Sequence, residues 1–247
     1  MKKHPLLPIA VALVLFNASA AHAQASVTWG MSAGWNRYTE ANMALRGPEL
    51  GLHARVESLF PKAQVDLEAD VLLGKQNYTS TSTGSMRNVG NVETRWRILG
   101  DILEGSGLST GLAFHTLWND LQGVATDGSG QTFSGYQRSA QQWWLPLRWQ
   151  PADGWTYEIG SLLRGKHSSA LSQASPGTYS DITNRQSHGT YLQASVSLGL
   201  PNGDRLSPFV RYTHLSTSDV VNMGGKNWTE PNNHRLQTGV VWQFVSP

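Results

Sequence analysis

The sequence HRLQTGVVWQF occupies positions 234–244, close to the C-terminal end of the chain. Alternate positions form a largely apolar and aromatic set: Leu236, Thr238, Val240, Trp242 and Phe244. The positions between them are mostly polar and begin with Arg235 and Gln237. A period of two residues places these two sets on opposite faces of a β-strand. The apolar face would point into the core of a soluble sheet, whereas in a transmembrane barrel it would point to lipid and the polar face to the interior.

The first 23 residues have the three parts of a secretory signal peptide. Lys2 and Lys3 supply the positive start, residues 5–16 form an apolar run, and Ala21-His22-Ala23 fits a cleavage site. The apolar run is shorter than the roughly 20 residues that a membrane-spanning helix needs, and no later segment approaches that length. We therefore expect residues 1–23 to be removed, and any membrane insertion to use strands.

The composition favours one exported domain of β-strands. Without Lys2 and Lys3 the 19 basic residues fall to 17, equal to the 17 acidic residues, so nucleic acid is not an expected partner. The 10 Trp, 25 Gly and 39% hydrophobic residues, with negative mean hydropathy, suit alternating strands. Cysteine is absent from the sequence, so no disulfide is expected. Because no Pro/Ser-rich linker divides the chain, residues 24–247 are predicted to form a single domain.

Alternation recurs in ten segments. The predicted strands are 27–39, 50–59, 63–78, 91–103, 108–119, 135–150, 155–166, 187–200, 206–215 and 234–244. Three acids in the third segment, Asp66, Glu68 and Asp70, must share one face because they are two residues apart. Pro146 lies within the sixth segment and cannot donate a ladder hydrogen bond, so a bulge is expected there.

The connections alternate in length along the chain. Short turns fall near positions 61, 105, 152 and 202, and longer connections are expected at 40–48, 79–90, 120–134, 167–186 and 216–233. A soluble β-sandwich has no reason to sort its loops in this way. The pattern predicts an all-β fold, a single ten-stranded antiparallel up-and-down transmembrane β-barrel with short periplasmic turns and longer extracellular loops. An even number of strands places both termini in the periplasm.

The chain resembles the outer-membrane β-barrel superfamily of Gram-negative bacteria over its whole length. The resemblance includes the signal peptide, the sidedness of the loops, the last strand and a set of candidate membrane-interface aromatics: Trp29, Trp35, Trp118, Trp143, Trp149, Trp155, Trp242 and Phe244. The patterns Gly135-Tyr136-Gln137-Arg138, Leu145-Pro146-Leu147 and Leu163-Arg164-Gly165 are similar to small uncharacterised barrels of this superfamily. The resemblance implies a monomer in the bacterial outer membrane that contacts its lipids and lipopolysaccharide. It also implies that the barrel assembly machinery recognises the last strand, although three residues follow Phe244 here.

If the apolar faces point to lipid, the charged residues collect inside the barrel. The predicted ion-pair network of the lumen consists of Glu57, Asp66, Glu68, Asp70, Glu93, Arg95, Arg97, Asp101, Arg138, Arg148, Glu158, Arg164, Arg211 and Arg235. A barrel of about ten strands is only slightly wider than the eight-stranded kind that its own side chains fill. Buried charges need partners, so we expect arginines and carboxylates to pair and plug the lumen.

The expected role is therefore structural, or an adhesin-like interaction of the outer loops with an extracellular ligand, since loops on a rigid scaffold often carry function. One alternative is a lipid A-type ester hydrolase. Lipid A deacylases carry His-x-Ser-Asn, and His167-Ser168-Ser169-Ala170 matches the His and Ser of that motif, with a hydroxyl nucleophile beside a base. The other alternative is a narrow channel. Neither a metal site nor a cofactor is expected, because the strand histidines are scattered singly.

Overall fold

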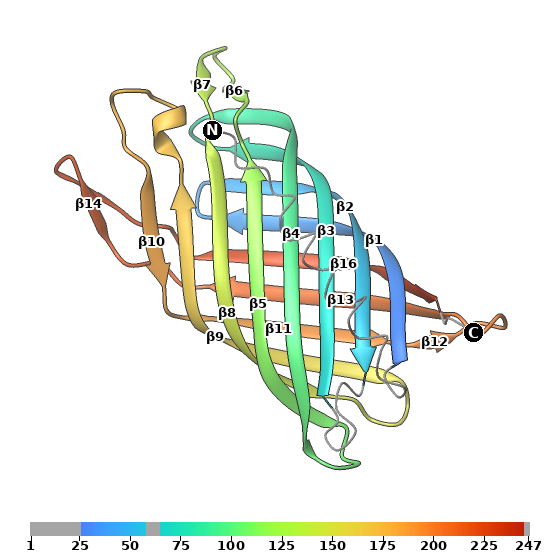
Figure 1. Cartoon of the computed structure of the whole chain (residues 1–247). Helices are drawn as coiled ribbons and strands as arrows, with labels where there is room; N and C mark the ends of the chain where they lie inside the picture. The colour runs from blue at the N-terminus through green and yellow to red at the C-terminus, as the bar shows by residue number, and fades with distance from the viewer. Residues whose placement is uncertain (1–25, 58–64, 245–247) are drawn as a thin grey trace.

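Ten long strands close into one antiparallel barrel in the computed structural model, which describes residues 26–57 and 65–244 (Figure 1). The barrel strands, in order around the wall, are β1 (Ser26–Glu40), β2 (Met43–Glu57), β3 (Val65–Ser80), β4 (Gly84–Leu103), β5 (Leu108–Asp120), β8 (Gln137–Trp149), β9 (Trp155–Ser169), β11 (Gly189–Val196), β13 (Arg205–Leu215) and β16 (Asn233–Phe244). The ten-stranded barrel predicted from the sequence is confirmed.

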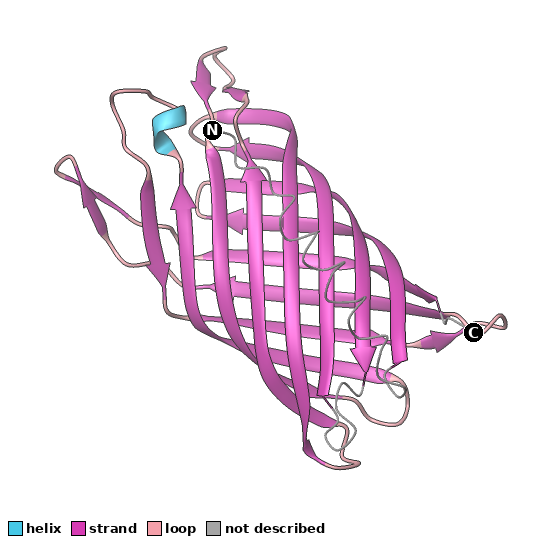
Figure 2. Ribbon diagram, viewed as in Figure 1, coloured by secondary structure: helices cyan, strands magenta, loops and turns pink. Residues whose placement is uncertain are grey.

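Short elements extend the barrel at its two ends. They are β6 (Val124–Thr126), β7 (Thr132–Ser134), β10 (Ile182–Gln186), β12 (Leu198–Gly199), β14 (Val221–Met223), β15 (Lys226–Trp228) and one 3-10 turn, Leu171–Gln173. Figure 2 draws that turn as a cyan helical ribbon. No helix among the described residues is long and apolar enough to cross a membrane.

The last strand closes the barrel on the first. β16 pairs with β1 from Trp29↔Phe244 to Glu40↔Asn233 and with β13 on its other side. Its faces alternate as expected, with Leu236 and Trp242 exposed and Arg235 and Gln237 buried. Closure gives the backbone N–H and C=O groups of the edge strands hydrogen-bond partners. Strands in lipid need this pairing, because lipid offers no such partners. The predicted signal peptide, the turn near position 61 and residues 245–247 lie outside the described residues.

The connections sort to opposite ends, but two of the expected outer loops are strands instead. Only Ala41 and Asn42 separate β1 from β2, and residues 81–83 separate β3 from β4. The prediction of long connections at 40–48 and 79–90 is therefore wrong. The strands continue past the apolar zone with polar residues such as Arg46 on their outer face, and continued pairing still satisfies the backbone. Three long outer connections remain, at 121–136, 170–188 and 216–232.

An apolar belt surrounds the barrel. The candidate interface aromatics all lie on its outward face, where Trp29 is 47% exposed, Trp35 51% and Trp242 45%, and Trp118 is partly covered. Leu50, Leu73 and Leu192 are also exposed on this face. Exposed apolar side chains in such number are expected where lipid, and not water, surrounds the wall.

A β-bulge changes the faces of β9. The register between β8 and β9 shifts between Trp143 and Trp144, so that Leu163 and Arg164 are both exposed on the outside. Arg164 therefore does not enter the lumen, and the sequence prediction for it is wrong, because one extra residue reverses the alternation. The bulge expected at Pro146 is also wrong. The β5–β8 pairing skips Leu145 and Pro146 without changing register, and the Pro146 carbonyl accepts a hydrogen bond from the Thr110 hydroxyl at 2.6 Å.

Side chains fill the interior. Trp144, Tyr191 and Leu162 form an apolar cluster on one wall with Ala113 and Leu215. The Tyr191 ring lies over Gly160, its cross-strand neighbour, where an added Cβ would overlap the ring. A second cluster, of Tyr38, Leu45, Val89 and Leu121, lies toward the outer end. Charged and neutral polar side chains occupy much of the remaining interior.

Candidate functional site

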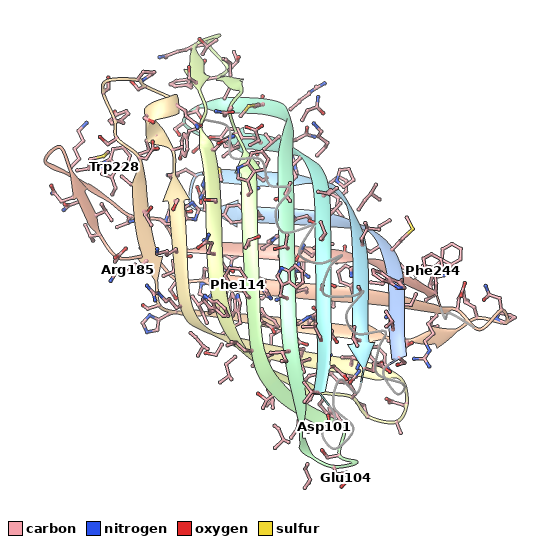
Figure 3. The ribbon with its side chains drawn as sticks, viewed as in Figure 1. Asp101, Glu104, Phe114, Arg185, Trp228 and Phe244 are labelled. Atoms are coloured by element: carbon pink, nitrogen blue, oxygen red, sulfur yellow. The ribbon has the colours of Figure 1, made fainter. Side chains whose placement is uncertain are left out.

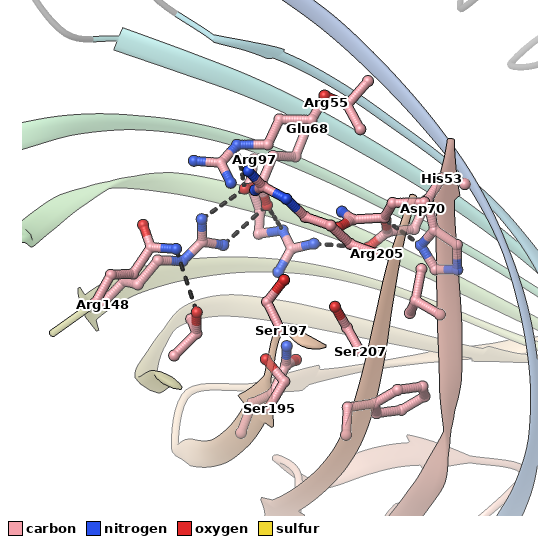
Figure 4. A pocket seen from close by; sticks show the side chains of 18 of the residues that line it. His53, Arg55, Glu68, Asp70, Arg97, Arg148, Ser195, Ser197, Arg205 and Ser207 are labelled. Carbon is pink, nitrogen blue, oxygen red and sulfur yellow. Dashed lines mark hydrogen bonds and ion pairs between the residues drawn. The ribbon is translucent and has the colours of Figure 1, made fainter. Parts of the chain in front are cut away.

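Glu68 of β3 lies at the centre of the ion-pair network in the periplasmic half of the barrel (Figure 4). Arg148 of β8 binds it with two parallel bonds, Nη1 to Oε1 at 2.5 Å and Nη2 to Oε2 at 2.8 Å. The Nε atoms of Arg97 and Arg55 approach its carboxylate at 2.9 and 3.5 Å. One carboxylate thus contacts three guanidinium groups from three strands, and the two-bond pair with Arg148 is the most directional of these contacts.

The network continues from Glu68 to both sides. Arg97 reaches Asp70 at 2.8 Å, and Asp70 also contacts His53 at 2.8 Å. On the other side Glu158 accepts hydrogen bonds from Arg148 at 2.8 Å and from the Tyr191 hydroxyl at 2.6 Å.

Arg211 ends this chain of contacts. Its guanidinium lies 3.9 Å from the centre of the Tyr191 ring and donates to Gln193 at 3.0 Å. A buried cation over an aromatic face is held by the charge distribution of the ring, so Arg211 has a partner in the lumen without a direct ion pair.

A second group of charges lies around Glu93 of β4. Glu93 contacts Arg95 and Arg235, each at 2.8 Å, and Arg235 also reaches Glu49 at 3.3 Å. Gln237 of β16 donates to Glu49 at 2.8 Å and accepts from Arg95. These five residues come from opposite walls, so the group crosses the lumen.

Arg138 of β8 joins the barrel to an outer loop. It pairs with Glu40 of β1 at 3.1 Å and with Glu230 of the 216–232 connection. Its Nη2 also donates to the Tyr38 hydroxyl at 3.3 Å, and its Nε to His167 Nε2 at 3.2 Å. Arg138 is 2% exposed, so these partners replace its water shell.

A cavity of about 290 Å³ lies at the periplasmic end of the lumen. Ser195, Ser197 and Ser207 line one side, and Arg97 and Arg148 form part of its charged lining (Figure 4). The cavity borders the ion pairs of Glu68. The interior therefore holds charge in fixed pairs, and side chains occupy the lumen beyond this periplasmic cavity.

The structure separates the predicted network residues into three groups. Those buried among lumen partners are Glu68, Asp70, Glu93, Arg95, Arg97, Arg138, Arg148, Glu158, Arg211 and Arg235. Glu57 and Asp66 lie at the periplasmic rim, where both bind Arg55 and the Glu57 side chain is 41% exposed. Asp101 and Arg164 are not in the network. Asp101 is exposed near the β4–β5 turn, beside Glu104 in Figure 3, and Arg164 faces outward.

Several members of the network were missed from the sequence. They are Tyr38, Glu40, Glu49, His53, Arg55, Tyr191 and Glu230. Glu40 and Glu230 lie in segments expected to be loops, which hid their role. Alternation could have found His53 and Arg55, because both share a face with Glu57.

His167 and Ser169 do not face the membrane. Both are buried on the lumen face of β9, 8% and 5% exposed, and His167 is bound by Arg138 and lies 3.4 Å from Glu230. A nucleophile acting on membrane lipid would need to reach the lipid, so this placement gives no support to the ester hydrolase alternative. Within residues 26–57 and 65–244, no group of three or more His, Asp and Glu residues is arranged to hold a metal ion.

No protein-family model matches the sequence, and no curated protein is significantly similar to it. The structure is similar to the translocator domain of the autotransporter NalP from Neisseria meningitidis, with a TM-score of 0.51 and 10% identity over 96% of this chain and 97% of that chain. It is also similar to the β domain of the Bordetella autotransporter BrkA, with a TM-score of 0.50 and 12% identity over 89% and 98% of the two chains. The outer-membrane protease OmpT from Escherichia coli gives a TM-score of 0.46 and 9% identity over 90% and 96%. At these identities the similarity concerns the fold, which is that of an outer-membrane β-barrel.

The fold and the apolar belt together place the protein in the bacterial outer membrane. A closed antiparallel wall with an outward apolar face and a charged interior is the arrangement by which strands span that membrane. The belt is in contact with membrane lipid, and a buried charged network occupies the interior.

Proposed function

We propose that the protein is a closed scaffold of the outer membrane that presents its outer loops as an ordered, adhesin-like binding surface for an extracellular partner. The observation that carries this proposal is the set of bonds that fasten the loops to one another and to the lumen network. A solid barrel provides the rigid base that binding loops require.

The 170–188 and 216–232 connections are bonded to each other. Asn184 of β10 donates to the carbonyl groups of Asp219 and Trp228 at 3.0 and 3.1 Å. The backbone N–H of Arg185 donates to the Asp219 carboxylate at 2.6 Å. The rings of Tyr179 and Trp228 meet edge to face at 5.4 Å. Figure 3 shows Arg185 and Trp228 on this outer extension, far from Asp101.

One of these loops is anchored to the barrel, and the third outer connection, at 121–136, is ordered by its own hydrogen bonds. Glu230 connects the 216–232 segment to Arg138 inside the barrel. In the β6–β7 hairpin the Ser129 hydroxyl donates to Asp127 at 2.7 Å, and the N–H groups of Ser129 and Gln131 add bonds of 2.9 Å. These bonds lower the pKa of the Asp127 carboxyl, because they favour its charged form.

The exposed loop surface is mostly neutral and polar. Residues 174–180 read ASPGTYS and residues 222–229 read NMGGKNWT, rich in Ser, Gly, Asn and Thr. Binding surfaces of this composition make adaptable hydrogen bonds around a few aromatic anchors, as antibody loops do. A preformed loop surface also loses less conformational entropy on binding. Both features support interaction with a partner over a purely structural role.

We expect the purified barrel in lipid nanodiscs to bind at least one member of an array of immobilised glycans and extracellular-matrix proteins. A variant with residues 174–180 and 222–229 replaced by Gly and Ser should lose that binding. Replacing the periplasmic turn residues 201–203 in the same way should leave it unchanged. Binding that survives the loop replacement, or a wild-type protein that binds nothing on the array, would contradict the proposal.

A further inference from the structure

Two arginines face each other on the outside of the barrel near its outer end. Arg37 of β1 and Arg46 of β2 are directly opposite in the strand register, and both are exposed on the outward face. Neither side chain makes an ion pair or hydrogen bond with another described residue. Like charges directly opposite on neighbouring strands repel each other, so this pair destabilises the pairing of β1 and β2 unless an anion binds between the two arginines.

Two further cations extend the group across four adjacent strands. Lys75 of β3 lies two residues from Asn77, the partner of Arg46, and Arg87 lies in β4 at the register shift opposite Asn77. Both side chains are exposed, and neither forms an ion pair within the described part of the chain. We call Arg37, Arg46, Lys75 and Arg87 the basic patch. The nearest outward acid on the next strand, Asp120 of β5, lies over Gly90 and accepts a hydrogen bond from the Gln122 N–H.

The basic patch begins where the apolar belt ends. Trp35, two residues from Arg37 on the same face, is 51% exposed, and Leu73, two residues from Lys75, is 53% exposed. Leu50, 64% exposed, follows Arg46 and Pro48 down β2. A lipid molecule against this wall would therefore place its acyl chains on Trp35, Leu50 and Leu73 and its headgroup at the cations.

We propose that the basic patch is a binding site for a phosphorylated lipid of the outer leaflet, with the Arg37 and Arg46 guanidinium groups on a headgroup phosphate. Two guanidinium forks side by side match the oxygen atoms of a phosphate, and Lys75 and Arg87 add charge to a second phosphate on the same headgroup. The bound anion removes the repulsion between the arginines. The occupant is a lipid and not a free anion because the site continues directly into the apolar belt.

A second group of outward cations provides a matched comparison. Arg164, which the β9 bulge turns outward, lies near Lys166, and Lys166 is directly opposite Arg185 of β10. Here an acid is close by, since the Asp219 carboxylate binds the backbone N–H of Arg185. The Asp219 carboxylate places a negative charge beside Arg185, so we expect this group to need an external anion less than the basic patch does.

The test is native mass spectrometry of the full barrel in detergent, titrated with bisphosphorylated lipid A. Arg37→Gln/Arg46→Gln should weaken binding by about tenfold or more, whereas Arg164→Gln/Lys166→Gln should change it by less than about threefold. All four positions are exposed, and heat-modifiable migration on gels verifies that each variant is folded. Equal losses in the two variants would indicate general charge attraction and overturn the proposal, as would no loss in either.

Two further arms identify the source of the phosphate. Lipid A from which the phosphates have been removed should bind about tenfold more weakly to the wild-type protein. Inorganic phosphate at millimolar concentration should not displace the intact lipid. Displacement by inorganic phosphate, or unchanged binding of the dephosphorylated lipid, would contradict a binding site for a phosphorylated lipid.

Discussion

Replacing Glu68 with glutamine should lower the free energy of unfolding of the barrel by about 3–5 kcal/mol, because three neighbouring guanidinium groups would then share one carboxylate fewer in the buried interior. Arg55, Arg97 and Arg148 all contact this carboxylate. Each would keep at least one other carboxylate partner, but the three positive charges would lose the negative charge that lies between them. The measurement is urea unfolding of the protein reconstituted in lipid vesicles, followed by tryptophan fluorescence.

Glu57→Gln is the control for this experiment. Glu57 binds Arg55 at 3.3 Å, as Glu68 does at 3.5 Å, but its side chain is 41% exposed whereas that of Glu68 is 8% exposed. Since water screens an exposed pair, the expected cost is about 0–1 kcal/mol. If both variants lost the same small amount, the lumen charges would be hydrated and the filled interior would be wrong.

Replacing Arg138 with methionine should also cost about 3–5 kcal/mol, because Glu40 and Glu230 would remain buried without their cation. The loss should also release the 216–232 connection, which Glu230 fastens to the barrel. Chymotrypsin added to whole cells should then cleave after Trp228 faster than in the wild-type protein. The control is Arg205→Met, an exposed cation at the periplasmic end, which should leave cleavage unchanged. An unchanged cleavage rate in the Arg138 variant would show that the loop is held by other contacts.

The architecture could be predicted because the signal for it is local. Alternation along 234–244 was enough to assign Leu236 and Trp242 to the outside and Arg235 and Gln237 to the inside, as the structure has them. The period-2 pattern needs no knowledge of distant residues. The number of strands and the short turns near positions 105, 152 and 202 followed from the same pattern repeated along the chain.

The contacts inside the barrel could not be predicted, because they depend on register and on distant segments. Arg138 and Glu230 are 92 residues apart in the chain, and Glu230 lies in a connection without alternation. Arg164 illustrates a different limit. A single extra residue at the β9 bulge reverses the faces beyond it. The residues at the bulge, Leu162 to Arg164, include no glycine or proline, and Gly165 follows them without marking where the extra residue lies.

Single-channel recording in planar lipid bilayers tests most directly that the ion-pair network closes the lumen. The wild-type protein is inserted from detergent and verified as folded by heat-modifiable migration. It should give no conductance steps in about 1 M KCl, a salt concentration that strongly screens exposed charges. A porin inserted in the same bilayer shows that steps would be detected. Reproducible conductance steps from the wild-type barrel would contradict a lumen filled by Glu68, Glu93, Arg138 and their partners.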